Sequence, residues 1–380
     1  MLLTIYSILA LFYWVFLTLY LIINGRKIAY LSSIEMSTDD DLSVVIIIAS
    51  RNEEASLKQA LTSVCNLEYK NYRVLVVNDR STDNTTNILS ELQVKYQKLS
   101  VINIDTLPEG WLGKNHALYT GSKFSDEDYI LFTDADVLFK KDVLNKAMHY
   151  CLKNNLDHLT ILPGIISSSS LLNSVVMTFV IMLTALQRPW AAKIRKSKAS
   201  MGVGAFNLVK RDMYIQAGTH EAIAMRPDDD LKLAASIKAA GGKADVLYGQ
   251  NEIEVEWYAS VKEFINGLMK NIFSGFKYNV FFAALGAIGT LFFFVLPLPI
   301  LLVFGTNTER IFALIILVFQ LVLYGSMPGS SGKWWYGFIT IYSGLVMTYI
   351  IIKAAATNLY NGGIYWRETF YSLTELRRHK

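Results

Sequence analysis

The chain begins with an almost unbroken apolar run, Met1 to Ile23, which ends at the polar and basic residues Asn24-Gly-Arg-Lys27. The run is too long for the apolar part of a signal peptide, and its basic residues follow it instead of preceding it. It therefore predicts a transmembrane anchor over residues 1–23. Arg26 and Lys27 place the end of this anchor in the cytoplasm, so the residues up to about 279 are expected to be cytosolic.

The C-terminal third carries three further apolar runs and then a basic tail. They predict a transmembrane region of two or three helices over residues 280–357 and a tail over 358–380. Three crossings would put the basic tail outside, against the charge rule. Because Pro297 and Pro299 remove helix donors, the first run is expected to break, leaving one run that does not cross and a cytosolic tail. The runs are Val280–Phe304, Ile311–Met327 and Trp335–Ile352.

Between these membrane blocks, short β-branched runs alternate with amphipathic stretches. Fully apolar strands separated by helices indicate an α/β fold, a doubly wound and largely parallel sheet, which we assign to residues 43–255. The predicted strands are Ser43–Ala49, Arg73–Val77, Val101–Ile104, Tyr129–Thr133 and His158–Leu162. The predicted helices are Glu53–Leu67, Asp83–Lys95, Asn115–Phe124, Lys141–Leu152 and Leu231–Ala240.

Two other stretches have the pattern of segments that lie in a membrane interface. Leu171–Leu186 is apolar on most faces and is followed by Trp190 and the basic Lys193–Lys198. Val261–Tyr278 places aromatic and aliphatic residues at helical spacing with lysines between them, so residues 256–279 are predicted to be interfacial. The alternative for both stretches is packing in a protein core.

Composition and charge narrow the classes of function. Hydrophobic residues make up 52% of the 380 residues and charged residues 18%, in agreement with separate membrane and soluble parts. The net charge of +4 is too small to argue for nucleic acid. The only cysteines, Cys65 and Cys151, match no disulfide framework or metal-ligand spacing and are expected to be buried thiols.

Polar and acidic clusters follow three of the predicted strands, at residues 50–54, 78–83 and 134–136. The carboxyl ends of parallel strands meet at one edge of a sheet, where ligands bind. Each cluster alone could be turn or capping chemistry, but three together point to a site. Asp134 and Asp136 form a D-x-D, whose carboxylates can share Mg²⁺ or Mn²⁺ with a nucleotide diphosphate. Neither G-x-x-x-x-G-K-[ST] nor G-x-G-x-x-G occurs.

In their order and spacing, these motifs resemble membrane-bound inverting glycosyltransferases of family 2, a group with a GT-A fold. The subgroup includes hopanoid-associated and carotenoid-acid glycosyltransferases. The matching segments are Val44–Glu54, Val76–Thr85, Pro108–Lys114, Asp134–Asp136, Gly202–Arg211 and Gly362–Arg367.

The resemblance implies roles for single residues. Asp79 would recognise the uracil of a UDP-sugar, Asp134 would lie by the ribose and diphosphate, and Asp136 would ligate the metal. Lys114 would contact the donor. The remaining residues implied for the nucleotide pocket are Arg51, Asn52 and Glu53.

The same resemblance places the catalytic base among three consecutive aspartates. The family pattern selects Asp229 and Asp230, with Asp230 as the base and Asp229 or Asp228 as alternatives. The base would take the acceptor's proton as its oxygen attacks, in a single inverting displacement. An acidic helix N-terminus would explain the same residues, and both readings are compatible.

The chain also departs from the family pattern. Ala49 stands where the family has a proline, just before the turn Arg51-Asn52-Glu53, which we call the R-N-E turn. His116 stands where the family has a tryptophan, and we expect it to line the pocket wall. The Q-x-x-R-W motif of processive synthases is absent; the corresponding stretch is Asn266–Asn271, where Lys270 would be the cation near the diphosphate.

The sequence therefore predicts transfer of a single sugar, a hexose, from UDP to a membrane lipid or isoprenoid-type acceptor, by a multi-pass cell-membrane protein with a cytosolic catalytic domain. A processive polysaccharide synthase is the alternative within enzymes. From a different class, the chain could bind nucleotide sugars in the membrane without turnover. A transporter would need more spans and more polar intramembrane residues.

Overall fold

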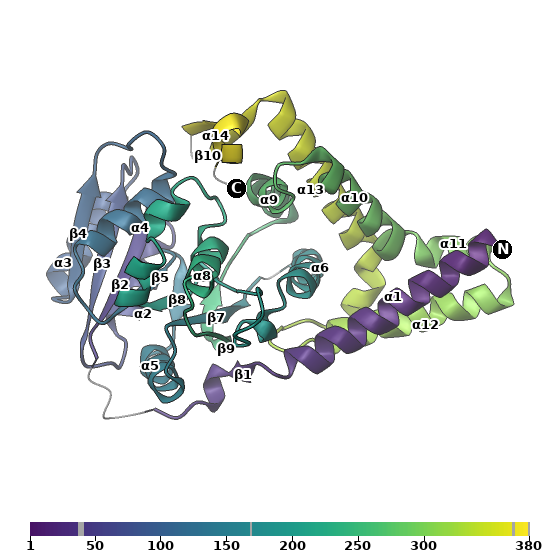
Figure 1. The fold of residues 1–380 in the computed structure, drawn as a ribbon, viewed down its shortest axis with the longest axis horizontal. Coiled ribbons are helices and arrows are strands. Elements are labelled where there is room, and N and C mark those ends of the chain that lie inside the picture. Colours follow the sequence, from purple (N-terminus) through teal and green to yellow (C-terminus); the bar gives the residue numbers. More distant parts are fainter. Residues whose placement is uncertain (37–41, 168, 367–368, 379–380) are drawn as a thin grey trace. The chain divides into compact units, whose positions relative to one another are not determined.

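A computed structural model describes residues 1–36, 42–167, 169–366 and 369–378 (Figure 1). Arg367, which ends one of the motif segments, and residues 379–380 of the predicted tail lie outside these ranges. The chain divides into two compact units. The α/β unit comprises residues 28–166 and 188–256, and the helical unit comprises residues 1–27, 167–187 and 257–380.

The α/β unit is built on a nine-stranded sheet with the order β1-β9-β7-β8-β5-β2-β3-β4, in which β6 also pairs with β9. Its strands are β1 Ala29–Tyr30, β2 Val44–Ser50, β3 Tyr72–Asp79, β4 Leu99–Ile104, β5 Tyr129–Thr133, β6 Val137–Phe139, β7 His158–Ile165, β8 Asn207–Lys210 and β9 Ala244–Val255. Its α-helices are α2 Leu57–Cys65, α3 Thr85–Lys95, α4 Gly113–Lys123, α5 Val143–Asn154, α7 Arg211–Gln216 and α8 Asp229–Ala239. Its 3-10 turns are Leu31–Ser33, Pro189–Ala191 and His220–Ile223.

Parallel pairing of β2 with both β3 and β5 brings the predicted polar clusters to one edge of the sheet. Ser50 is level with Asn78, and Ile48 is level with Thr133. The turns that follow these three strands therefore emerge side by side. This register confirms the mostly parallel sheet that the apolar runs predicted.

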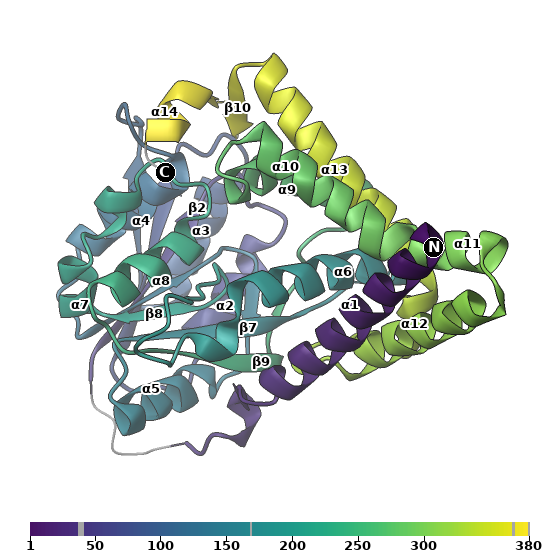
Figure 2. The same cartoon turned by 45° about the vertical axis from the view of Figure 1, so that its right-hand side comes forward.

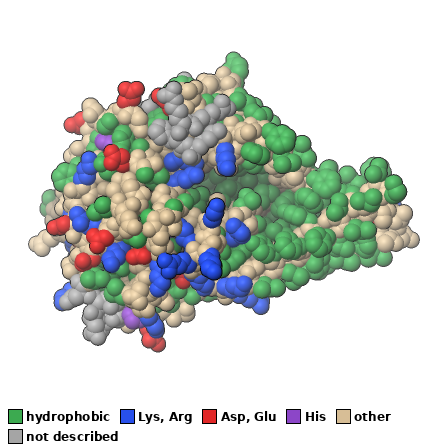
Figure 3. All heavy atoms as spheres, in the orientation of Figure 1, with side chains coloured by type: hydrophobic (Ala, Val, Ile, Leu, Met, Phe, Trp, Pro, Cys, Tyr) green, Lys and Arg blue, Asp and Glu red, His purple; other side chains and the backbone are tan. Residues whose placement is uncertain are grey.

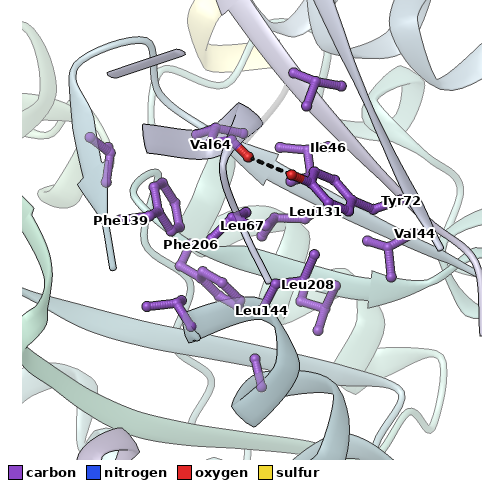
Figure 4. Close-up of a cluster of buried hydrophobic side chains, with 14 of the residues drawn as sticks. Val44, Ile46, Val64, Leu67, Tyr72, Leu131, Phe139, Leu144, Phe206 and Leu208 are labelled. Carbon is purple, nitrogen blue, oxygen red and sulfur yellow. Dashed lines mark hydrogen bonds between the residues drawn. The ribbon is translucent and has the colours of Figure 1, made fainter. Parts of the chain in front are cut away.

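Helices cover both faces of the sheet, which is why the central strands are apolar throughout. Even-numbered residues of β2, such as Ile46, pack with α2, α3 and α5, and odd-numbered ones, such as Ile47, pack with α4, α7 and α8. Figure 4 shows the first of these layers, in which Ile46 and Leu131 lie near the ring of Tyr72. The Tyr72 hydroxyl donates to the Val64 carbonyl over 3.1 Å, so its polar end is satisfied inside the core.

Four strands of the sheet, β1, β6, β8 and β9, were missed by the sequence analysis, and β8 and β9 matter most for its architecture. β8 is only four residues long and runs antiparallel between β5 and β7. β9 is twelve residues long and pairs in parallel with β7, with a bulge between Pro163 and Gly164. The insertion of β8 makes the sheet mixed, and it carries the segment just before it, residues 202–206, to the edge where β5 ends.

The helical unit contains long apolar helices that lie side by side in pairs, α1 with α12 and α10 with α13 (Figures 1 and 2). Its helices are α1 Leu2–Gly25, α6 Ser170–Gln187, α9 Val261–Gly275, α10 Val280–Thr290 with a π-turn Leu291–Val295, α11 Pro297–Phe304, α12 Asn307–Ser326, the 3-10 segment Trp334–Ile339, α13 Thr340–Tyr360 and α14 Leu373–Arg378. A short hairpin, β10 Gly363–Trp366 and β11 Thr369–Ser372, precedes α14.

Within the described residues, four helices are long and apolar enough to cross a membrane: Leu2–Gly25, Ser170–Ala191, Asn307–Ser326 and Trp334–Tyr360. The consecutive helices Val280–Val295 and Pro297–Phe304 would together make a fifth span. They are bent by 50° relative to each other, at the break just before Pro297. Exposed apolar side chains cover much of the helical unit's displayed surface (Figure 3). Phe12 and Phe16 on α1 are among the exposed aromatic residues of this unit. An apolar surface of this kind suits a membrane environment. The number and direction of crossings remain predictions.

The segment that we placed in the interface, Leu171–Leu186, forms α6 and packs inside the helical unit. The Thr178 and Tyr324 hydroxyls are 2.6 Å apart, and Ser174 approaches Ser343 at 3.4 Å. The helix is also long and apolar enough to span a membrane. Its position in the membrane interface therefore stays a prediction.

Candidate functional site

The turns after β2 and β3 are joined by reciprocal hydrogen bonds. The backbone N–H of Asn52 donates to Ser81 Oγ at 3.1 Å, and that of Thr82 donates to Asn52 Oδ1 at 2.8 Å. The N–H of Glu53 donates to Thr85 Oγ1 at 2.9 Å. Asn52 has a φ of 55°, a conformation that asparagine tolerates better than most residues. The R-N-E turn is therefore fixed against the turn that follows Asp79.

Asp79 ends β3 and is buried, at 3% exposure. Its carboxylate accepts two hydrogen bonds from the neighbouring Arg80, at 2.7 and 3.0 Å. Gly113 begins α4 directly against it, since a Cβ there would lie 2.6 Å from Asp79 Oδ2. The close approach of α4 fixes one wall beside Asp79, and the half-buried His116 lies on the same helix.

Lys114 stands at the start of α4 and is surrounded by carboxylates. Its Nζ lies 2.7 Å from Asp134 Oδ1 and 3.5 Å from Asp229 Oδ2. A cation at a helix N-terminus opposes the helix dipole, so this placement needs compensation. Burial opposes the charge, but Asp134, Asp229 and Asp230 outweigh it and raise the pKa of Lys114. The lysine is therefore held as a fixed positive charge at the sheet edge.

Two glycines let the segment before β8 press against the carboxylates. Asp134 donates its backbone N–H to the Gly204 carbonyl at 3.0 Å, and Gly204 donates its own to Asp230 Oδ2 at 2.9 Å. A Cβ on Gly204 would lie 2.3 Å from Asp134 Oδ2, and one on Gly202 would lie 2.0 Å from the Asp230 carbonyl oxygen. Only glycine fits at position 202, and a side chain at position 204 would displace the Asp134 carboxylate. Both glycines lie in the segment that resembles the G-x-G of the family named above.

The three aspartates before and at the start of α8 have different surroundings. Asp228 pairs with Arg226, whose Nη2 lies 2.8 Å away. Asp229 is buried at 7% exposure, and burial raises its pKa despite the nearby Lys114. Burial, with repulsion from Asp229, raises the pKa of Asp230 to about 7. Asp228 is therefore held in an ion pair with Arg226, whereas Asp229 and Asp230 lie near Lys114.

Asp136 forms a second acidic group with two neighbours. Burial, followed by the charges of Asp134 and Glu53, raises the pKa of Asp136 to about 6. Oxygen donors that repel one another favour a hard divalent cation, because the cation relieves the repulsion. Within the described ranges, no set of three or more His, Cys, Asp or Glu side chains is arranged to hold a metal alone. Asp136, Asp134 and Glu53 are thus oxygen donors that could hold a hard divalent cation only together with oxygens from a ligand.

A small cavity opens between the lysine and the carboxylates. His220 lines it, with its Nδ1 2.8 Å from the Tyr214 hydroxyl. Burial, together with the charge of Lys114, lowers the pKa of His220 to about 3, so the ring is neutral. The lining residues are Lys114, Leu118, Phe132, Thr133, Asp134, Gly204, Asn207, His220, Asp229 and Asp230.

Asn115 was missed by the sequence analysis and joins α4 to the segment before α8. Its buried amide lies 2.9 Å from the carbonyl oxygens of Ile223 and Arg226 and 3.1 Å from that of Ala224. The partners are more than one hundred residues away along the chain. Asn115 thereby holds Lys114 and the aspartates of α8 at a fixed separation.

The predicted site residues do not all fall in one place. The structure brings together two groups at the sheet edge, the Lys114 group (Asp134, Asp229 and Asp230) and the Asp136 group, linked through Asp134. Arg51 is half-buried after β2, in the turn described above. Lys270 lies in α9 of the helical unit, and its side chain is outside the described part of the structure.

With this geometry in place, the domain can be compared with known proteins. Residues 45–217 match the model of the family described as glycosyl transferase family 2. The match covers a little less than half of the chain and agrees with the family resemblance of the motifs. The finer resemblance to hopanoid-associated and carotenoid-acid enzymes remains a prediction.

Two curated relatives are similar over part of the chain. A β-monoglucosyldiacylglycerol synthase from Nostoc is 38% identical over 103 residues, which cover 27% of this chain and 22% of that protein. A poly-β-1,6-N-acetyl-D-glucosamine synthase from Staphylococcus aureus is 26% identical over 222 residues, covering 55% of this chain and 51% of that protein. The chain thus spans between about a fifth and a half of these relatives.

One solved structure is similar over nearly the whole chain. It is a mannosyltransferase from Pyrobaculum calidifontis in complex with GDP-Man and Mn²⁺, with a TM-score of 0.56 and 16% identity. The likeness covers 94% of this chain and 99% of that one. It shows a shared fold, and the GT-A fold expected from the motifs is confirmed.

Replacing Asn115 tests whether it holds the two halves of the site together. Asn115→Ala leaves buried carbonyls without their donor, so we expect the free energy of unfolding to fall by about 1–3 kcal/mol. Thermal or denaturant unfolding of the purified protein measures the change. The matched control is Asn154→Ala, because that exposed amide also donates to a carbonyl, at 2.9 Å from Tyr150. An equal effect of both substitutions would show that Asn115 has no special role.

Proposed function

We propose that this chain is an inverting glycosyltransferase that moves a single sugar, a hexose, from a UDP-sugar to a hydroxyl group of a membrane lipid or isoprenoid-type acceptor. The observation that carries the proposal is the cluster at the sheet edge, where Asp230, Asp229 and Asp134 surround Lys114 inside a family 2 domain. Such a cluster supplies both a proton acceptor and a positive charge for a leaving group.

Asp230 is the base in this proposal. Its pKa of about 7 lets it be ionised near neutral pH and still accept a proton readily. As the acceptor oxygen forms its bond to the anomeric carbon, the bond from that carbon to the diphosphate oxygen breaks, and the hydroxyl proton passes to Asp230. The N–H of Gly204, 2.9 Å from Asp230 Oδ2, holds the carboxylate in position.

Lys114 supports the donor. The carboxylates around it keep it protonated, so a positive charge is available for the departing diphosphate without reorganisation. Asp229 lies 3.5 Å from Lys114 and is the alternative base. Lys270, implied as a second cation near the diphosphate, remains part of the proposal on the strength of the sequence resemblance alone.

Asp136 and Asp134 would hold the divalent cation, with Glu53 beside them. When bound, Mg²⁺ or Mn²⁺ would neutralise charge on the diphosphate. The mannosyltransferase of similar fold is described as a complex with Mn²⁺, which supports this choice of metal.

The nucleotide would be recognised where the turns after β2 and β3 join. Asp79, buried and fixed by Arg80, would accept hydrogen bonds from the uracil. Arg51, Asn52 and Glu53 would line the same pocket. The similar mannosyltransferase binds GDP-Man, so UDP specificity is a proposal that nucleotide competition can test directly.

A lipid acceptor is supported by two independent observations. The helical unit has helices apolar enough to cross a membrane, and one relative is a synthase of a glucosylated diacylglycerol. The polymer alternative also has support, because the other relative makes a poly-N-acetylglucosamine. The absence of Q-x-x-R-W in this sequence favours the transfer of one sugar, and product size analysis decides between the two.

Asp230→Asn is expected to lower the rate of transfer by about a hundredfold or more, because no group then accepts the acceptor's proton. Donor binding should be retained, since the substitution keeps the shape of the side chain. The rate is measured as UDP release with membrane lipid extract, and binding by calorimetry. Asp212→Asn, at an exposed position in the first turn of α7, is the matched control and should leave both unchanged. Full transfer by Asp230→Asn would refute this assignment of the base.

The pH dependence of transfer follows from the pKa of Asp230, about 7. The base works only when ionised, so kcat/KM should fall about tenfold per pH unit below that value. An unperturbed aspartate would keep its activity to about pH 4. Lys114 lowers the pKa of Asp230, so in Lys114→Met the residual activity should decline from a higher pH. A profile that is flat from pH 5 to 8 would contradict the proposal.

Metal removal tests the roles of Asp134 and Asp136. Transfer should be lost in EDTA and restored by Mg²⁺ or Mn²⁺, since repulsion between the carboxylates and the diphosphate would otherwise weaken donor binding. Asp136→Asn should raise the metal concentration needed for half-maximal rate. Unchanged transfer in EDTA would show that the donor is held without a metal.

A further inference from the structure

Residues 188–198, which we name the basic loop, follow directly on α6 and carry five of the chain's basic residues: Arg188, Lys193, Arg195, Lys196 and Lys198. They lie in a stretch, residues 158–211, that contains no aspartate or glutamate. Figure 3 shows Lys and Arg side chains gathered on the displayed face of the α/β unit. The charge of this loop is therefore not balanced along the sequence.

The backbone of the basic loop is folded into consecutive turns. Ala192 donates to the Pro189 carbonyl at 3.0 Å, Ile194 to Ala191 at 3.1 Å, and Ser197 to Ile194 at 2.9 Å. Trp190 is buried at 6% exposure and anchors the first turn. The loop is thus a formed structure that presents its charged side chains outward.

Lys238 of α8 holds the backbone of the basic loop through hydrogen bonds. Its Nζ donates to the Ile194 carbonyl at 2.9 Å and also to that of Ala192. Its ammonium is engaged by the backbone and strengthens the positive character of the loop. Because α8 also carries Asp230 in its first turn, the basic loop is fixed to the same helix as the proposed base.

Most of the outward side chains of the basic loop lack an anionic partner among the residues that the structure describes. Lys193, Arg195, Lys196 and Lys198 are exposed, and Ile194 between them is 53% exposed. No carboxylate among the described residues pairs with Arg188, Arg195, Lys196 or Lys198. These basic side chains surround an exposed aliphatic one and directly follow, in the sequence, a helix apolar enough to cross a membrane. Such a segment matches the surface of a bilayer rich in anionic lipid.

We propose that the basic loop binds the phosphate groups of anionic membrane lipids and thereby places Asp230 over an acceptor held in the same leaflet. This deepens the proposed function, on which its catalytic consequence rests, by naming the lipid surface that the enzyme needs. Each lysine or arginine near such a surface contributes about fivefold to its affinity, and salt weakens the attraction.

The binding test uses the full chain in lipid nanodiscs and does not require activity. A polarity-sensitive fluorophore is attached at Ser197→Cys, since the native cysteines Cys65 and Cys151 are buried. We expect a blue shift and protection from an aqueous quencher in discs containing phosphatidylglycerol, but not in phosphatidylcholine alone. A label at Ser100→Cys, an exposed residue of β4, should not respond. Equal responses of the Ser197 label in both lipids would overturn the proposal.

Charge variants link the response to the loop. The triple variant Arg195→Gln/Lys196→Gln/Lys198→Gln should lose the blue shift, as high salt should in the wild type. The control Lys95→Gln/Lys123→Gln/Lys153→Gln removes the same amount of charge from three other exposed positions. This control variant should keep the blue shift. A triple variant that responds like the wild type would overturn the proposal.

Transfer measured in the same discs separates the outcomes. We expect phosphatidylglycerol to stimulate the wild type and the control, and the loop variant to stay near its rate in phosphatidylcholine. A raised KM for the UDP-sugar with unchanged lipid stimulation would mean that the loop binds the donor, and the proposal would fall. If no sugar is transferred by any protein while the Ser197 label still responds, the proposed function fails and the lipid contact stands.

Discussion

The arrangement of this protein depends on holding several carboxylates close together at the edge of a sheet. Asp134, Asp229 and Asp230 repel one another, and burial makes the charges of Asp229 and Asp230 costlier. One lysine offsets this cost, with Asp134 2.7 Å from its ammonium. The rest of the α/β unit can be understood as the framework that keeps this lysine and these carboxylates in place, since a shift of either would leave buried charge unpaired.

The framework works through backbone as much as through side chains. Gly204 both accepts from the backbone of Asp134 and donates to the carboxylate of Asp230, so one residue sets the distance between two acids. β8 brings that glycine to the site by running against the direction of its neighbours. The irregular part of the sheet is therefore the part on which the positions of the acids depend.

Much of the α/β unit could be predicted because its cause is local. Runs such as Ser43–Ala49 are apolar on both faces, and parallel pairing then determines where the residues after them emerge. The four-residue strand β8 could not be found, because so short a segment carries no periodicity of its own. The partners of Asn115 and the pKa of Asp230 depend on residues far apart in the sequence, which only the folded chain brings together. The features of the sequence that could have pointed to these contacts were the glycines Gly202 and Gly204, and Asn115 next to Lys114.

The hydrogen bonds of the Asn115 amide have a consequence for how far the site can move. Its amide ties the start of α4 to the carbonyls of residues 223–226, just before α8. These hydrogen bonds restrain Lys114 on one helix from moving away from the acids on the other. An arriving substrate would meet dipoles and charges already oriented toward it, so little of its binding energy would be lost to ordering the protein.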